Sequence, residues 1–83
     1  MKLMERVKAT MRVKRYSLRT EKTYCYWIRF YIRLNNLRHP ATLTGHEVRQ
    51  FLEYLAIERH VAAATQNQAL NAIVFLYRHV LDQ

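Results

Sequence analysis

Two stretches carry most of the information in this chain: Tyr16-Ser17-Leu18-Arg19-Thr20-Glu21-Lys22-Thr23-Tyr24 and Ala64-Thr65-Gln66-Asn67-Gln68-Ala69-Leu70. Each stretch joins a short break to the first turn of an amphipathic helix, and each fills that turn with hydroxyl, amide or cationic groups. The free backbone amides of a helix start attract phosphates, and side chains of these kinds suit phosphates and base edges. The pattern therefore predicts two helix starts that face a nucleic acid.

The length and the charge narrow the class of protein further. With 83 residues the chain has room for one modest core, so we expect a single domain over residues 1–83. Because 51% of the residues are hydrophobic, a packed core is attainable. Fourteen Lys and Arg face six Asp and Glu, which gives a formal net charge of +8 and points to a polyanionic partner. Nucleic acid is favoured over an anionic membrane surface.

The single cysteine, Cys25, lies inside a helical pattern and is expected to have a structural role. A small protein from an oxidising compartment would more often carry paired cysteines, so a reducing, cytoplasmic environment fits better. Near the amino terminus, Lys8, Lys14 and Arg15 interrupt every apolar run. We therefore expect neither a signal peptide nor a membrane span.

Apolar residues recur at three- and four-residue spacing almost throughout, and the only Gly and Pro lie near the middle. This spacing predicts an all-α fold, a compact bundle of four helices. The helices are expected over residues 2–15, from residue 18 to the break at Asn35-Asn36-Leu37-Arg38-His39-Pro40, from Thr44 to about Arg59, and over residues 64–81.

Three local signals set the expected helix ends. Ser17 can cap the second helix by accepting the backbone amide of Thr20. Thr44-x-x-Glu47 has the form of a capping box at the start of the third helix. Pro40 cannot continue an amide ladder and is expected to end the second helix.

The second and fourth helices each show a polar face. On the second helix an aromatic and aliphatic face opposes a basic one, made of Arg19, Lys22, Tyr26, Arg29 and Arg33. On the fourth helix the predicted core face is Gln66, Leu70, Ile73, Val74, Tyr77 and Leu81, and the predicted outer face is Asn67, Gln68, Asn71, Phe75 and Arg78. Amide side chains are those that read adenine edges in a groove, so the outer face is a candidate for base contacts.

The candidate DNA-binding residues form three groups. Along the first helix and the turn after it they are Lys8, Arg12, Lys14 and Arg15. The second helix supplies Ser17, Arg19, Thr20, Lys22, Thr23, Tyr26, Arg29 and Arg33. The fourth helix supplies Thr65, Asn67, Gln68 and Asn71.

No catalytic or cofactor motif accompanies these residues. The sequence has no glycine-rich phosphate loop, no Cys and His metal cluster and no paired-carboxylate site, so no metal and no cofactor are expected. The histidines His39, His46, His60 and His79 lie near helix ends or in breaks and are expected at the surface or in caps. His46-x-x-Arg49 matches a string found in tyrosine recombinase active sites, but here we interpret it as coincidence.

Two other classes of function stay open at this stage. Exposed Phe75 and Tyr54 would suit a protein-interaction bundle whose positive charge only aids solubility or steering. A complete enzyme that uses the tyrosines and histidines is the least favoured class, because no site converges.

Three blocks together resemble a known family: Tyr16-Ser-x-x-Thr-x-x-x-Tyr24, Phe51-Leu52-x-x-Leu55 and Thr65-Gln-Asn-Gln-Ala-Leu-Asn-Ala-x-x-Phe-Leu-Tyr77. The chain resembles, over essentially its whole length, the amino-terminal core-binding domain of tyrosine recombinases, the phage integrase family. It looks most like the integron integrases, which have similar Arg-Tyr-Ser-x-Arg-Thr-Glu and Ala-x-Thr-Gln-Asn-Gln-Ala-Leu blocks.

This resemblance implies a SAM-like four-helix domain that forms one half of a clamp around double-stranded DNA. Within such a clamp the second and fourth helices approach the major groove. The implied partners are the catalytic domain of the same recombinase, which this chain lacks, and other protomers in a synaptic tetramer. The domain alone would bind DNA in a bacterial cytoplasm without cleaving it, and no tyrosine here would be the nucleophile. Related chains often have Ser at the fourth helix cap where this one has Ala64.

Overall fold

The computed structural model describes residues 1–83 and contains four α-helices: α1 (Leu3–Val13), α2 (Leu18–Leu34), α3 (Gly45–Ile57) and α4 (Ala63–Phe75). A 3₁₀ turn, Pro40–Thr42, lies between α2 and α3, and a π-helical segment, Leu76–Val80, continues α4. The chain has no strand, and its radius of gyration is 12.3 Å. The prediction of an all-α, compact four-helix SAM-like bundle is confirmed.

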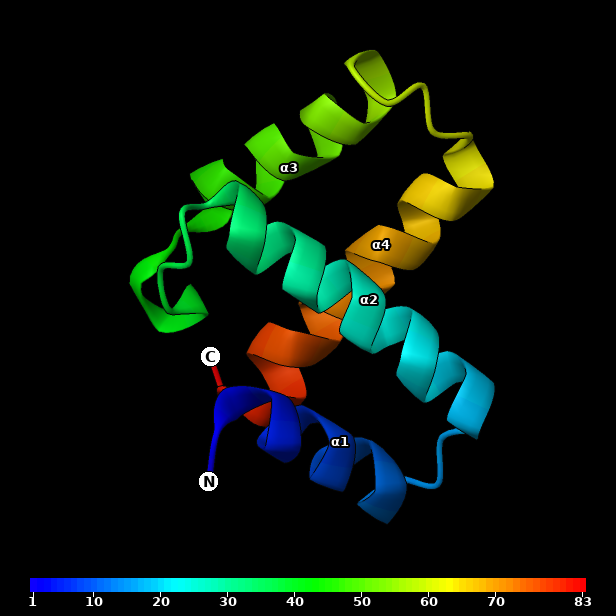
Figure 1. The fold of residues 1–83 in the computed structure, drawn as a ribbon, viewed down its shortest axis with the longest axis vertical. Coiled ribbons are helices and arrows are strands. Elements are labelled where there is room, and N and C mark those ends of the chain that lie inside the picture. The colour runs from blue at the N-terminus through cyan, green and yellow to red at the C-terminus, as the bar shows by residue number, and fades with distance from the viewer.

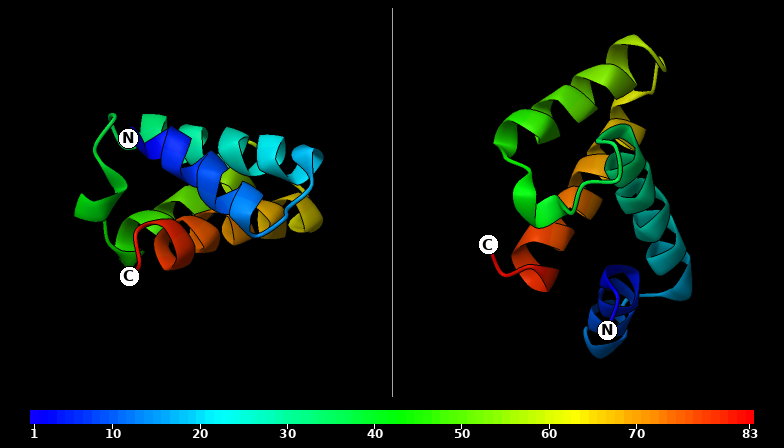
Figure 2. Two further views of the ribbon diagram at one scale, coloured as in Figure 1. Left: turned by 90° about the horizontal axis from the view of Figure 1, so that it is seen from below. Right: turned by 60° about the vertical axis from the view of Figure 1, so that its left-hand side comes forward.

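The helices are arranged around α4. Helix α2 crosses α4 and makes the most extensive contact in the molecule, while α3 packs on α4, and α1 packs on α2 and on the π-helical segment. Figure 2 (left) shows α1 and α2 on one side of the molecule and α4 on the other. The amino-terminal ends of α2 and α4 both lie on the right-hand side of Figure 1, and the turned view in Figure 2 agrees.

Side-chain caps define the starts of α2 and α3 as predicted. The Ser17 hydroxyl oxygen accepts the backbone N–H of Thr20 at 3.1 Å. At α3, the Glu47 carboxylate accepts both the backbone N–H and the hydroxyl of Thr44, and these hydrogen bonds hold the pKa of Glu47 below its usual range. His39 also has a capping role, because its Nδ1 accepts the N–H of Ala41 in the 3₁₀ turn at 3.0 Å.

The other boundaries differ from those expected in position or in cause. Helix α2 ends at Leu34, well before Pro40, because Asn36 and Leu37 adopt left-handed conformations with φ of 59° and 62°. Pro40 instead begins the 3₁₀ turn and is buried. The prediction that Pro40 terminates the second helix was therefore wrong.

The fourth helix begins one residue earlier than expected, at Ala63. Its N-cap is Ala62, whose side chain makes no capping hydrogen bond. Ala64 lies inside the first turn, so the prediction that it occupies the cap position was wrong.

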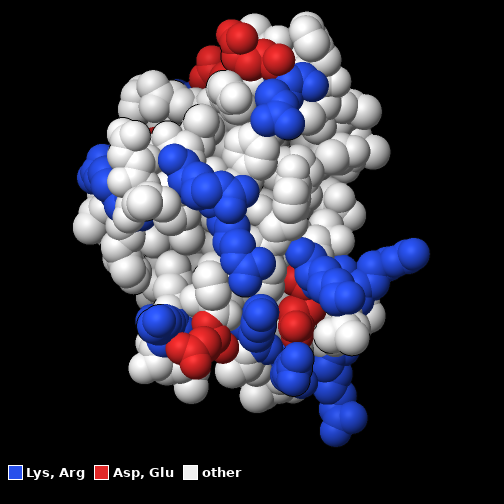
Figure 3. Space-filling view, viewed as in Figure 1, with Lys and Arg blue, Asp and Glu red and all other residues white.

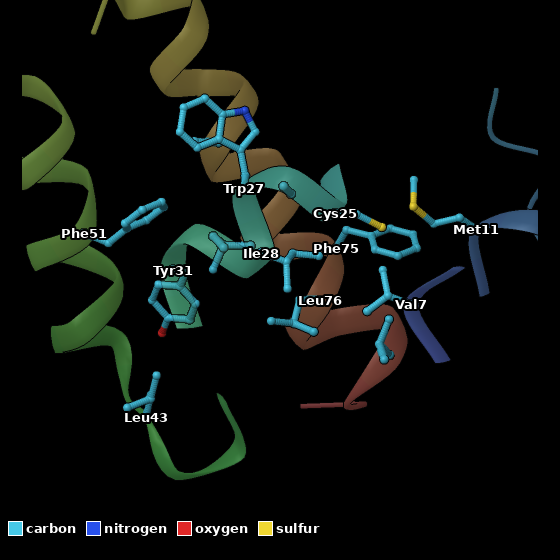
Figure 4. Packing of buried hydrophobic residues seen from close by; sticks show 14 of the residues in the cluster. Val7, Met11, Cys25, Trp27, Ile28, Tyr31, Leu43, Phe51, Phe75 and Leu76 are labelled. Atoms are coloured by element: carbon cyan, nitrogen blue, oxygen red, sulfur yellow. The ribbon is translucent and has the colours of Figure 1, made fainter. Parts of the chain in front are cut away.

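The core is a single cluster of 15 buried residues contributed by every helix. Its largest fully buried side chains include Tyr31 and Ile28 of α2, Phe51 of α3 and Met11 of α1. Figure 4 shows these side chains converging between the helices. The predicted apolar face of the second helix is confirmed, since Trp27, Ile28 and Tyr31 are buried and Tyr24 and Ile32 pack against the cluster.

A chain of hydrogen bonds joins three elements inside this core. The Tyr77 hydroxyl donates to the carbonyl oxygen of Pro40 at 2.8 Å and lies 2.9 Å from the Tyr31 hydroxyl. Since Tyr77 has only one hydroxyl proton, Tyr31 is the donor in the second bond. Burial raises the pKa of both phenols, and the bond to Tyr77 raises that of Tyr31 further. Both tyrosines are therefore neutral hydrogen-bonding groups at neutral pH.

The predicted orientation of α4 was partly wrong. Phe75, expected on the outer face, is only 3% exposed and packs against the rings of Tyr16 and Tyr24. Val74, expected in the core, is 39% exposed. The reason is that α4 carries apolar residues around most of its circumference and is covered by α2 and α3 at once, so periodicity alone does not select one face.

Tyr54 was also expected on an outer face. It is half-buried, packs against the core and lies 6.3 Å from the ring of Phe30. The two aromatic residues that suggested an exposed apolar surface therefore belong to the packing of the domain.

Replacing Phe75 with Ala should lower the free energy of unfolding by about 3 to 5 kcal/mol, because it leaves a cavity between α4 and Tyr16 and Tyr24. The matched change Val74→Ala removes a half-exposed side chain and should cost less than about 1 kcal/mol. Urea denaturation of both variants measures the difference. Equal losses, or a larger loss for Val74→Ala, would contradict the orientation of α4 described here.

Candidate nucleic-acid interface

The net positive charge of the chain comes from its first 34 residues, which include the first two helices and the turn between them. Residues 1–34 contain ten Lys and Arg and two Glu, whereas residues 35–83 contain four Lys and Arg and four Asp and Glu. The whole net charge of +8 therefore comes from residues 1–34. Figure 3 shows the resulting surface, on which basic side chains spread over α1 and α2 while a separate acidic group lies beside the end of α3.

The basic row on α2 is exposed as predicted. Arg19, Lys22, Arg29 and Arg33 all lie at the surface, and none forms an ion pair or a side-chain hydrogen bond within the molecule. At a rise of 1.5 Å per residue the row from Arg19 to Arg33 is about 21 Å long. Tyr26, in the middle of the row, is 50% exposed, and its ring packs edge-on against Trp27.

The cations of α1 continue this surface. Lys8, Arg12, Lys14 and Arg15 are exposed. Burial raises the pKa of the Cys25 thiol, and the positive charges of Arg29 on α2 and Lys8 on α1 partly oppose this rise, so both cations lie near Cys25. Cys25 itself is 2% exposed and packs in the core.

One acidic residue is built into this basic surface. Glu21 is buried, and its carboxylate accepts a hydrogen bond from Arg12 Nε at 3.2 Å, the single ion pair of the molecule. Because 69% of the Arg12 side chain stays exposed, the remaining guanidinium N–H groups are free to donate. This role of Glu21 was not predicted, although the sequence contains a signal for it: Glu21 stands four residues before Cys25 and seven before Ile28, on the buried side of the helix.

The turn between α1 and α2 holds Arg15 in an unusual conformation. Arg15 has a φ of 62°, and the next amide, that of Tyr16, donates to the carbonyl oxygen of Met11 at 3.0 Å. This is the pattern of a helix that ends in a left-handed residue, a position usually occupied by Gly. Tyr16 then packs on Phe75, which ties the turn to α4.

The predicted hydroxyl contacts at the start of α2 are already partly engaged. The Ser17 hydroxyl donates to Thr20 Oγ1 at 2.9 Å, and the Thr23 hydroxyl donates to the carbonyl oxygen of Arg19 at 3.1 Å. Thr20 keeps its own hydroxyl proton free, so it is the one of the three that can donate to a phosphate without breaking a bond. Thr20 and Thr23 are half-buried, and Ser17 is exposed.

The predicted amides of α4 are free. Asn67, Gln68 and Asn71 are exposed and make no hydrogen bond within the molecule, whereas Thr65 is half-buried. Gln66 differs from them, because its side chain donates to the carbonyl oxygen of Leu52 at 3.1 Å.

Helical spacing relates the amides to α2. Gln68 and Asn71 stand seven and four residues before Phe75, on the same side of α4, and Phe75 contacts Tyr24 of α2. Thr20 lies one turn before Tyr24, on the flank of α2 that faces α4. Around the same helix, Lys22 and Arg29 lie on the flank toward α1, and Arg19 lies on the outer crest between the two flanks. The amides thus lie toward one flank of α2 and most of the cations toward the other.

Thirteen of the sixteen predicted residues are exposed, three are half-buried and none is buried, so each has surface to offer a partner. No three His, Cys, Asp or Glu side chains come together as they would around a metal ion, and the surface hollows are shallow and open. No helix combines the length and the apolar character needed to cross a bilayer. His46 and Arg49 lie exposed on α3.

The fold and this surface define a small helical domain with an exposed, strongly basic face. Residues 3–83 match the family described as "Phage integrase, N-terminal SAM-like domain". Two proteins named "Integrase/recombinase", from Escherichia coli and Pseudomonas aeruginosa, are each 46% identical to the chain over 80 residues. This alignment covers 96% of the chain and 24% of each relative. The chain therefore belongs to the phage integrase N-terminal SAM-like family and spans about a quarter of the length of these relatives.

The left-handed conformation of Arg15 leads to a stability prediction. Arg15→Gly should raise the free energy of unfolding by roughly 0.5 to 1 kcal/mol, because Gly adopts a positive φ without the steric cost that Arg has. Lys14→Gly removes the same charge at a residue with φ of −82° and should lower stability by a similar amount. Thermal and urea unfolding of the pair test this, and stabilisation by both changes would indicate charge relief rather than backbone strain.

Proposed function

We propose that this chain is the DNA-binding, core-binding domain of a site-specific tyrosine recombinase. The observation that carries the proposal is the exposed cationic surface of α1 and α2, in which a single cation has an acidic partner, together with the exposed, unbonded amide side chains of α4. Cations without intramolecular partners are available to phosphates, and free amides are available to base edges.

Affinity in this proposal comes mainly from phosphates. The row from Arg19 to Arg33 is about 21 Å long, enough to follow several phosphates of a duplex, and Lys8, Arg12, Lys14 and Arg15 extend it along α1. Each neutralised phosphate releases condensed counterions, so binding weakens as salt rises. The free hydroxyl proton of Thr20 and the unbonded amides of the first turn of α4 supply further phosphate donors at the two helix starts.

Part of the site preference comes from α4. Asn and Gln donate and accept hydrogen bonds in the geometry of the adenine edge in the major groove. Asn67, Gln68 and Asn71 need no rearrangement to do so, because no other group of the protein occupies them. Thr65 stands about one turn before Gln68, next to the helix start.

In the full-length protein this domain would form one half of a clamp, with a catalytic domain closing the other side of the duplex. The relatives named "Integrase/recombinase" extend well beyond the aligned region, which supports a larger parent protein. Partner protomers in a synaptic tetramer and a bacterial cytoplasmic setting belong to the same proposal. The blocks around Ser17 and Gln66 support the narrower assignment to integron integrases.

Strand cleavage is assigned to the catalytic domain rather than to this one. Burial raises the pKa of Tyr24, Tyr31 and Tyr77, which disfavours the phenolate that a nucleophile needs. A protein-interaction module is less well supported, because its anchors Phe75 and Tyr54 pack within the domain.

Charge reversal at the start of α2 tests the electrostatic part. Arg19→Glu should weaken binding to a short duplex by roughly tenfold or more at low salt and make the slope of log affinity against log salt shallower by about 0.9, the share of one phosphate. Fluorescence anisotropy over a salt series measures both. A negative charge in the first turn favours the helix, so lost binding would not reflect unfolding.

The matched control for this experiment is Arg49→Glu, which makes the same charge change at an exposed position of α3. It should leave the salt slope unchanged and reduce affinity only slightly. If the two variants lose affinity equally, or if the unchanged protein does not bind duplex DNA at low salt, the proposed interface is wrong.

Removing an amide side chain of α4 tests the proposed contacts with base edges. Gln68→Ala should reduce the sequence preference by the equivalent of about 1 to 3 kcal/mol while leaving the salt slope intact, because it removes a base contact and no phosphate contact. Enrichment of duplexes from a random pool measures the preference. Gln50→Ala, at an exposed amide of α3, serves as the control and should select the same sequences as the unchanged protein.

A further inference from the structure

Leu18 is an exposed leucine that does not pack on the core of the domain. It is the first residue of α2, it is 59% exposed, and it is not among the apolar side chains that pack on the core. Its neighbours on the surface are polar or positively charged. A leucine in this position contributes little to folding, so its contribution has to be sought in what binds there.

The surroundings of Leu18 form a shallow, open hollow lined by Leu18, Arg19, Lys22 and Thr23. Two of the lining residues are cations without an intramolecular partner. The Thr23 hydroxyl donates to the Arg19 carbonyl oxygen, which leaves the Thr23 methyl group as the free end of that side chain. The hollow therefore combines an apolar part, made of Leu18 and the Thr23 methyl group, with two positive charges.

This combination matches one feature of duplex DNA. Among the groups exposed in the major groove, the C5 methyl of thymine is the apolar one, and it lies between two phosphate backbones. Arg19 and Lys22 are complementary to the phosphates, and Leu18 and the Thr23 methyl are complementary to the methyl group. A phosphate alone would leave Leu18 and the Thr23 methyl group without an apolar partner.

Resting on the proposed function, we infer that Leu18 is a specificity-determining residue that packs on the methyl group of a thymine in the major groove. Its contribution is a preference for thymine at one position of the bound site, added to the readout by the amides of α4. Arg19 and Lys22 hold the flanking phosphates and so bring the base edge against the leucine.

The test removes the thymine methyl group from the DNA and, in a separate step, the leucine side chain from the protein. Binding is measured by anisotropy at low salt to a hairpin duplex of alternating adenine and thymine, about two helical turns long, and to the same duplex with uracil in place of thymine. The unchanged protein should bind the uracil duplex about fourfold more weakly, the effect of losing one buried methyl group.

The variant Leu18→Ala should bind both duplexes equally, whereas Leu37→Ala, at another exposed leucine, should keep the fourfold difference. The comparison of differences cancels any effect of uracil on the duplex itself. Ala is a good helix former and Leu18 lies outside the core, so circular dichroism should show unchanged helix content.

Each result decides something different. Equal binding of the two duplexes by the unchanged protein, or a fourfold difference that persists in Leu18→Ala, overturns the inference and leaves the proposed function standing. Absence of binding to either duplex overturns the proposed function itself, and the role of Leu18 with it.

Discussion

The rest of the structure depends on the burial of α4 and its π-helical continuation against α1, α2 and α3. Helix α2 makes the most extensive of these contacts, and α4 carries two fully buried small residues, Ala69 and Ala72, which allow neighbouring helices to approach closely. Tyr77 then bonds to Tyr31 and Pro40, and Arg6 Nη2 donates to the carbonyl oxygen of Val80 at 2.6 Å. Helix α4 is thus the element from which the others take their positions.

This burial decides which side of α2 faces the solvent. Once Ile28 and Tyr31 are committed to the contact with α4, the helical period turns Arg19, Lys22, Arg29 and Arg33 outward. The cost is a concentration of like charge on one half of the molecule, eased within the protein by a single ion pair, Arg12 with Glu21. Phosphates would relieve the remaining repulsion. The same concentration of positive charge that destabilises the isolated domain therefore favours a polyanionic partner.

Aromatic packing joins the core to the candidate interface. Phe75 contacts Tyr16 and Tyr24, with ring centroids 5.2 and 5.8 Å away, and these residues bracket the start of α2. Because Gln68 and Asn71 stand on the same side of α4 as Phe75, this cluster sets the spacing between the amides of one helix and the first turn of the other. Phe75, which was expected to be exposed, thus holds the end of α4 against the start of α2.

The features that could be predicted from the sequence are those that depend only on residues nearby in the chain. The caps at Ser17 and Thr44 need only residues within three positions, and the two-sided pattern of α2 follows from its own period. Prediction failed where the cause lies elsewhere in the chain. Phe75 was placed on the wrong side of α4, because the buried side of that helix is set by α2 and α3. The end of α2 was located correctly at the Asn35–Pro40 break, and only its cause was wrong, since the left-handed Asn36 and Leu37 end the helix before Pro40.

The residues alone specified four helices, a basic half and the polar groups at two helix starts, since charge and helical period are properties of consecutive side chains. Only the folded arrangement determined which side of α4 is buried, buried Phe75, paired Glu21 with Arg12 and placed the starts of α2 and α4 on the same side of the molecule. These outcomes depend on contacts between segments tens of residues apart. When a helix is apolar around most of its circumference, the helices that pack on it determine which of its faces is buried.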